Sequence, residues 1–185
     1  MQLIQTSLKD VFLVEPKVFG DERGFFLESY NEADFKAMGL PTHFVQDNHS
    51  GSRKGVLRGL HYQLKQPQGK LVRALRGEIF DVAVDLRQDS AQFGQWFGAV
   101  LNTVNRHSLW IPAGFGHGFL TMSDFAEVAY KATDFYAPAH ERSILWNDPA
   151  IGIDWPIDGE LILSAKDKVG LRLADAETYP TSPLL

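Results

Sequence analysis

Short apolar segments separated by Gly, Pro, Asn and Asp recur along most of the chain. The clearest pattern is in residues 80–86, where Phe80, Val82, Val84 and Leu86 alternate with Asp81, Ala83 and Asp85. A repeat of two fits a β-strand, whose successive side chains point to opposite faces, and does not fit a helix. This segment therefore predicts a strand with one apolar and one polar face.

Similar runs predict a series of strands over residues 11–16, 24–30, 44–48, 56–63, 71–75, 78–86, 95–101, 107–111, 118–121 and 127–135. One short helix is predicted from an Asn31 cap to Met38, ended by Gly39 and Pro41. The stretch after Ile162 has no regular pattern. A closed antiparallel sheet houses many short strands without exposed edges, so we expect a mainly β fold, an antiparallel β-barrel with one or two short helices.

Composition narrows the classes of function. The chain has 185 residues, 44% of them hydrophobic, and no linker-like stretch, so we expect a single domain over residues 1–185. A net charge of -5 argues against general nucleic-acid binding, which needs a basic surface. The chain has no cysteine, which excludes disulfides, thiolate metal sites and a thiol nucleophile.

The N-terminal residues MQLIQTSLKD have no basic stretch followed by a long apolar run, so they do not resemble a signal peptide. No apolar stretch is long enough for a membrane-spanning helix, which needs about 18 residues or more. We therefore expect a cytoplasmic protein that does not bind membranes.

Two histidine segments stand out. GVLRGLHYQ places His61 on a predicted strand, and PAGFGH places His117 five positions after Pro112. In this order they resemble the two halves of the cupin signature, in which a small jelly-roll barrel carries metal-binding histidines on its inner wall. The resemblance implies a cupin-like fold.

The histidine pattern departs from that of metal-binding cupins. Gln63 stands where those proteins have a second histidine, and no Glu follows at the expected spacing. A divalent transition metal usually needs at least three strong protein ligands, and His61 with His117 supplies two. We predict a barrel that holds no metal ion.

A single histidine on a strand is more often an ordinary structural residue than a catalyst. His61 is a stronger candidate because Arg58, Lys70 and His117 lie in segments that can converge on the same barrel interior. A buried polar cluster costs free energy and is therefore a sign of function. We assign no role to His43, His107 or His140.

Further segments occur in a fixed order along nearly the whole chain: VFGDERGFF (18–26), FVQDNHS (44–50), QGKLV (68–72), FDVAVD (80–85), LWIP (109–112), GHGF (116–119), YKAT (130–133) and SAKD (164–167). Together with the His61 segment they resemble the dTDP-4-dehydrorhamnose 3,5-epimerase family. The resemblance implies a cofactor-independent isomerase of dTDP-L-rhamnose biosynthesis, acting on a dTDP-sugar.

The resemblance also implies the catalytic roles. His61 is the expected base that removes the proton next to the C4 carbonyl of the sugar, and Asp167 orients its ring. Lys70 is expected to face the carbonyl oxygen, where negative charge develops. Tyr130 is expected to return a proton from the opposite face of the ring. On spacing alone, Tyr130 fits a core aromatic residue better than an acid.

Substrate-binding positions follow from the same resemblance. The diphosphate is assigned to cationic side chains, the sugar and phosphates to polar ones, and the nucleoside to Glu28 and the ring of Tyr136. The family often has two tyrosines where this chain has Phe135 and Tyr136. The full set is Arg23, Glu28, Gln46, Asp47, Asn48, Arg58, Lys70, His117, Tyr136, Glu141 and Lys166.

In this family the N-terminal strands cross to a partner subunit, which implies a homodimer with Arg23 and Glu28 in the partner's site. Two alternatives remain open. One is an enzyme that epimerises a single carbon or shifts the ketone; the other is a barrel that binds sugar nucleotides without catalysis. The presence of both Lys70 and Tyr130 favours the double epimerase.

Overall fold

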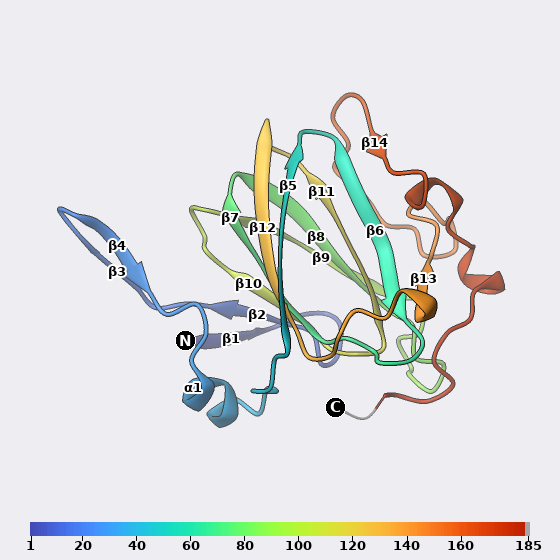
Figure 1. Ribbon diagram of the computed structural model, residues 1–185, viewed down its shortest axis with the longest axis horizontal. Helices are drawn as coiled ribbons and strands as arrows, with labels where there is room; N and C mark the ends of the chain where they lie inside the picture. Colours follow the sequence, from blue (N-terminus) through green and yellow to red (C-terminus); the bar gives the residue numbers. More distant parts are fainter. Residues whose placement is uncertain (184–185) are drawn as a thin grey trace.

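The computed structural model describes residues 1–183 and contains two six-stranded sheets and a separate two-stranded hairpin (Figure 1). The first sheet has the order β1 (Gln2–Gln5), β2 (Phe12–Glu15), β10 (Ser108–Ile111), β7 (Lys70–Arg76), β12 (Phe125–Ala132) and β5 (Gln46–Arg53). The second has the order β13 (Glu141–Ser143), β6 (Val56–Gln63), β11 (Phe115–Thr121), β8 (Glu78–Asp85) and β9 (Trp96–Asn102), with β14 (Ile162–Leu163) parallel to β6.

This architecture confirms the mainly β, jelly-roll prediction. Strand β6 has the predicted bounds, and the other predicted strands recur with shifted ends. The last predicted strand is wrong beyond Ala132, where β12 ends. The short strands β1, β3 (Val18–Asp21), β13 and β14 were not predicted. The two sheets also face each other without closing into one hydrogen-bonded barrel, because a jelly roll protects its edges by packing two sheets together.

The predicted helix is confirmed as α1 (Glu32–Ala37). The side chain of Asn31 accepts hydrogen bonds from the N–H groups of Ala33 and Asp34, and Gly39 ends the helix with a φ of 74°. Phe35 of this helix is buried against Trp110 on the outer side of the first sheet. Three short 3-10 helices, η1 (Pro138–His140), η2 (Asp167–Val169) and η3 (Leu173–Asp175), follow later in the chain.

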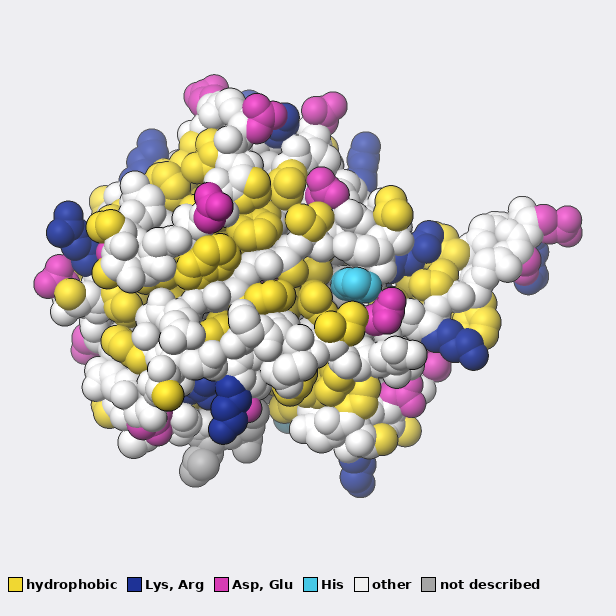
Figure 2. Space-filling view, turned by 180° about the vertical axis from the view of Figure 1, so that it is seen from behind, with side chains coloured by type: hydrophobic (Ala, Val, Ile, Leu, Met, Phe, Trp, Pro, Cys, Tyr) yellow, Lys and Arg dark blue, Asp and Glu magenta, His cyan; other side chains and the backbone are white. Residues whose placement is uncertain are grey.

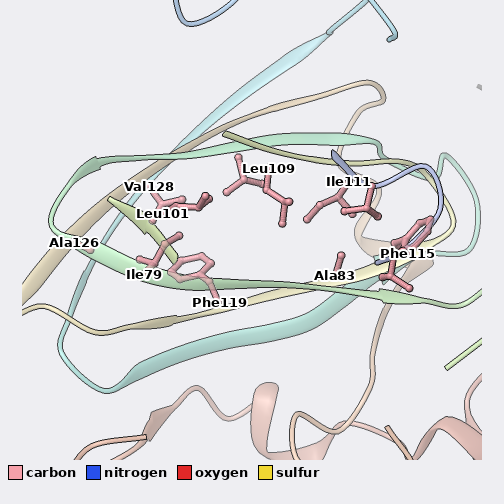
Figure 3. Packing of buried hydrophobic residues seen from close by; sticks show 12 residues of the cluster. Ile79, Ala83, Leu101, Leu109, Ile111, Phe115, Phe119, Ala126 and Val128 are labelled. Atoms are coloured by element: carbon pink, nitrogen blue, oxygen red, sulfur yellow. The ribbon is translucent and has the colours of Figure 1, made fainter. Parts of the chain in front are cut away.

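The main core lies between the two sheets (Figure 3). Ile79, Leu101 and Phe119 come from the second sheet, and Leu109 and Val128 come from the first. Alternation explains this arrangement, since every second residue of each strand faces the other sheet.

Strand β8 is the alternating segment seen in the sequence, and both of its faces are buried. Val82 and Val84 lie on the outer side and pack in a cluster with Trp155 and Tyr179. The chain after β13, orange to red in Figure 1, covers this side of the second sheet. Asp81 is on the other face and is fully buried. The face of β8 that carries Asp81 therefore turns inward, so part of the interior between the sheets must be polar.

The hairpin of β3 (Val18–Asp21) and β4 (Gly24–Leu27) extends away from both sheets, as Figures 1 and 2 show from opposite sides. Phe25 and Phe26 are 62% and 65% exposed. The guanidinium of Arg106 lies 4.0 Å from the centroid of the Phe25 ring.

Within residues 1–183, no helix combines the length and apolar character that a membrane span requires.

Candidate active site

A cavity of about 570 Å³ lies between the interior faces of the two sheets. Its volume lies in the range typical of small-molecule sites. The side chains that line it include most of the predicted catalytic and binding residues: Asn48, Arg58, His61, Lys70, His117, Tyr130, Tyr136, Glu141, Lys166 and Asp167.

A β-bulge brings Arg58 and His61 to the same face of β6. His61 pairs with His117, and Arg58 pairs with Phe119. Three positions along β6 therefore lie opposite only two positions along β11, which means that β6 holds one extra residue here. Without the extra residue, side chains three positions apart would point to opposite faces. Gly59 lies inside the bulge with a φ of 127°, a conformation that favours glycine.

His61 forms a close pair with Asp167. The distance between His61 Nε2 and Asp167 Oδ1 is 2.6 Å, and the ionised carboxylate can only accept, so Nε2 carries the hydrogen. Nδ1 of His61 is then the nitrogen left to take a proton. Burial of Asp167 opposes its ionisation, but hydrogen bonds from His61 and Ser164 outweigh burial and lower the pKa of Asp167 to about 2.

His117 lies opposite His61 and forms a second pair with a carboxylate. Its Nε2 is 2.7 Å from Asp81 Oδ1, and both residues are buried. Burial lowers the pKa of His117, an effect that the Asp81 carboxylate opposes only in part. The imidazole of His117 is therefore neutral near neutral pH and bonds its carboxylate as a donor.

Lys70 is a buried cation in the lining of the cavity. It is 8% exposed, and burial lowers its pKa to about 8 against the attraction of Asp81 and Glu141. The ammonium is thus still charged near neutral pH. A desolvated charge of this kind interacts strongly with an oxygen that becomes negative beside it.

Tyr130 reaches the cavity from the other sheet. It pairs with Asn48 on β5 and Val72 on β7, and its ring centroid is 6.3 Å from that of His117. Burial raises the pKa of the Tyr130 phenol, so the hydroxyl keeps its proton near neutral pH. His61 and Tyr130 therefore line one cavity from opposite sheets.

Polar side chains at the cavity are linked by hydrogen bonds. Glu141 accepts from the Tyr136 hydroxyl at 2.9 Å and pairs with Lys166. These partners, against the effect of burial, lower the pKa of the Glu141 carboxyl. Gln46 accepts from the Tyr136 N–H at 2.9 Å and donates to Asn48 at 2.9 Å.

Four predicted binding residues do not line the cavity of this chain. Gln46 is connected to it only through its hydrogen bonds with Tyr136 and Asn48. Arg23 is at the hairpin turn, paired with Asp21, and its side chain is 85% exposed. Glu28 accepts from the Asn31 amide at 3.1 Å. Asp47 is next to Asn48 on β5, so it faces the opposite side of the sheet and pairs with Lys131 at 3.0 Å.

Sequence reasoning missed Asp81 and Ser164, which hydrogen-bond to His117 and Asp167 of the site. Asp81 was assigned only to the polar face of a strand. The alternation of residues 80–86 did not indicate that this face points to the interior. Ser164 donates to Asp167 at 2.6 Å; the spacing of Ser164 and Asp167 matches a helix-capping pattern and could have indicated this contact.

Among residues 1–183, no three His, Cys, Asp or Glu side chains group together as a metal ion would need.

Comparison with known proteins gives the family. The family model for dTDP-4-dehydrorhamnose 3,5-epimerase matches residues 5–175. This chain belongs to that family. A dTDP-4-dehydrorhamnose 3,5-epimerase from Pseudomonas aeruginosa is 58% identical over 181 residues, which cover 97% of this chain and 100% of the relative. The family resemblance and the expectation of an isomerase are thereby confirmed.

A solved structure of the family matches the fold closely. It is the dTDP-6-deoxy-D-glucose-3,5-epimerase of Legionella pneumophila in complex with dTDP-4-keto-L-rhamnose, with a TM-score of 0.93 and 49% identity over 95% of this chain and 94% of that one. A dTDP-4-dehydrorhamnose 3-epimerase from Streptomyces niveus is 39% identical, covering 95% of this chain and 86% of the relative. Relatives of this chain thus include double and single epimerases.

Proposed function

We propose that this chain converts dTDP-4-keto-6-deoxy-D-glucose to dTDP-4-keto-L-rhamnose by epimerising C3 and C5, a step of dTDP-L-rhamnose biosynthesis. The observation that carries this proposal is the placement of the His61–Asp167 pair and Tyr130 in one cavity, on opposite sheets. Residue types suited to a base and an acid thus flank the space for a sugar ring.

The base step follows from the state of His61. The C3 and C5 protons are acidic because each is adjacent to the C4 ketone. Nδ1 of His61 takes one of these protons, and the C–H electron pair moves into an enolate whose charge falls on the ketone oxygen. Asp167 then faces an imidazolium, and Lys70 faces the enolate oxygen. A preorganised donor at such an oxygen is typically worth about 3 to 4 kcal/mol.

The acid step determines the stereochemistry. Tyr130 donates its phenol proton to the same carbon from the other side, the enolate returns to the ketone, and the configuration at that carbon is inverted. Exchange with solvent then returns a proton to Tyr130 and removes one from His61. A second cycle at the other carbon completes the reaction, with no oxidant, metal or cofactor consumed.

The binding roles follow from charge and shape. Arg58 and Lys166 are the cations we assign to the diphosphate, where a guanidinium can hold two oxygens at once. The exposed ring of Tyr136 is the platform for the nucleoside base, and Asn48 and His117 contact the sugar or phosphates. Gln46 and Glu141 hold Tyr136 through the hydrogen bonds described above.

We further propose a homodimer in which the β3–β4 hairpin enters the partner's site. Arg23 and Glu28 lie outside the cavity of their own chain, and the hairpin exposes Phe25 and Phe26. Mixing inactive Arg23→Ala and His61→Ala proteins tests this arrangement. If Arg23 serves the partner, mixed dimers regain one intact site and part of the activity; a mixture that stays inactive, although mixed dimers form, contradicts a shared site.

Isotope exchange tests the proposed reaction. Incubation with dTDP-4-keto-6-deoxy-D-glucose in heavy water, followed by NMR of the sugar, should show deuterium at both C3 and C5. Incorporation at one carbon supports a single epimerase, and binding without incorporation supports a non-catalytic protein. His61→Ala should abolish exchange at both carbons.

Treatment with a chelator provides the matching control for the cofactor-free mechanism. Activity should be unchanged after prolonged incubation with EDTA and dialysis. Loss of activity that added metal restores would overturn the assignment of the carbonyl charge to Lys70.

A further inference from the structure

Ser164 and Asp167 form a closed pair of contacts at the start of η2. The Ser164 Oγ accepts the backbone N–H of Asp167 at 3.2 Å and donates its own hydrogen to Asp167 Oδ2 at 2.6 Å. The first contact is the one expected of a serine three residues before an acidic residue at a helix start. The second is different, because in the usual arrangement the carboxylate turns back to the backbone of the capping residue.

The carboxylate of Asp167 is instead directed toward β6. Its Oδ1 accepts from His61 Nε2 at 2.6 Å and from the Gly59 N–H at 3.3 Å, while Oδ2 accepts from Ser164. Both oxygens are therefore occupied by donors on different sides. Rotation of the carboxylate would break at least one of these hydrogen bonds. Because the Asp167 carboxylate is charged and buried, losing such a bond costs free energy.

We propose that Ser164 is a positioning residue for the proton-transfer reaction, whose hydroxyl holds the Asp167 carboxylate in the orientation that aligns the His61 ring. This inference rests on the proposed function in assigning the base to His61. Ser164 acts through Asp167 and has no assigned contact with the sugar.

The hydroxyl also sets the electrostatic balance of the pair. By donating to Oδ2, Ser164 takes up part of the carboxylate charge that would otherwise act on the imidazolium of His61. Loss of the hydroxyl makes the imidazolium easier to form and a weaker acid. Other charged or titratable groups line the same cavity, and the substitution leaves them in place: Arg58 from β6, Lys70 from β7, His117 from β11, Tyr130 from β12, Tyr136 after β12, Glu141 from β13 and Lys166 beside η2.

The test compares Ser164→Ala with Ser164→Thr. For Ser164→Ala we expect kcat to fall about 10-fold, as for loss of a hydrogen bond to a charged group, with KM within about twofold of wild type. The midpoint of the His61 ring titration, followed by NMR in the free protein, should move to higher pH by about 0.5 to 1 unit. The acid limb of the kcat profile should move in the same direction. Ser164→Thr keeps the hydroxyl and should restore both values.

Ser90→Ala is the matched control. Ser90 also donates to a buried carboxylate, Asp85 Oδ2, at 2.7 Å, and that carboxylate pairs with Arg87 away from the cavity. Ser90→Ala should lower the free energy of unfolding about as much as Ser164→Ala does. It should leave kcat and the His61 titration unchanged.

Two results would overturn the inference: a Ser164→Ala protein with an unmoved His61 titration, or a loss of kcat that Ser164→Thr does not restore. The titration needs no substrate. A shifted titration in a protein that fails to epimerise the keto-sugar would therefore support the role of Ser164 and count only against the proposed function.

Discussion

Arg58 and His61 face the same cavity although three positions separate them on one β-strand. The extra residue of the β6 bulge makes this possible, and Gly59 adopts the left-handed backbone conformation that the bulge needs. A β-carbon at Gly59 would lie 2.5 Å from Gly118 Cα and 2.8 Å from the His117 carbonyl oxygen. The close approach of β6 and β11 thus depends on this glycine.

Gly59→Ala should therefore be strongly destabilised. We expect a loss of about 2 to 5 kcal/mol in the free energy of unfolding, combining backbone strain with the clash against β11. Denaturant unfolding measures it. Gly159→Ala is the matched control, because Gly159 also has a positive φ, 91°, but no atom lies within 4 Å of the added carbon. Equal losses in the two proteins would contradict the role of close packing at the bulge.

The Asp167 carboxylate should make stability depend on pH in the acid range. Its pKa is about 2 in the folded protein and near 3.8 when unfolded, so the folded state favours the charged form. The resulting stabilisation, about 2 kcal/mol, is fully present above about pH 4 and is lost as pH falls toward 2. Urea unfolding at several pH values should show the stability difference between wild type and Asp167→Asn shrinking over this window.

The exposed Asp158 provides a control for that measurement. Its side chain is 84% exposed and pairs with Lys54 at 2.8 Å, so Asp158→Asn should change stability little at any pH. If Asp167→Asn loses as much unfolding free energy between pH 4 and pH 2 as wild type does, Asp167 is not the source of the pH dependence.

Lys70 should determine the loss of activity at alkaline pH. Burial lowers its pKa to about 8, so the ammonium needed beside the enolate is charged below this value and lost as pH rises through it. We expect kcat/KM to fall above about pH 8. In Lys70→Arg the guanidinium stays charged, so the fall should move to higher pH while activity near neutral pH is reduced by the changed geometry. An alkaline limb that stays in place in Lys70→Arg would contradict this assignment.

Tyr130→Phe should separate proton exchange from inversion. The variant keeps the His61 base, so substrate protons can still exchange with solvent, but the acid on the other side is missing. We expect inversion to slow about 100- to 10,000-fold, the usual contribution of a general acid, with less effect on exchange. NMR in heavy water measures both rates on one sample. Equal slowing of the two rates would argue against Tyr130 as the second proton donor.

The sequence by itself determined much of the local structure and the family. The alternation in residues 80–86 specified a strand because a period of two suits only an extended backbone, and Asn31 and Gly39 marked the helix through contacts within a few residues. The ordered segments that include His61 and Asp167 were specific enough to indicate the family, which the comparisons confirm.

Only the tertiary structure decided which polar groups meet. Asp81 faces the interior because the C-terminal segment covers the apolar side of β8. These contacts join residues about 70 to 100 positions apart, which no local pattern encodes. The bulge at Gly59 depends on pairing with β11, and the donation from Ser164 to Asp167 depends on where η2 packs against β6. Periodicity reports the face of a strand, whereas the direction of that face and its partners are set by long-range packing.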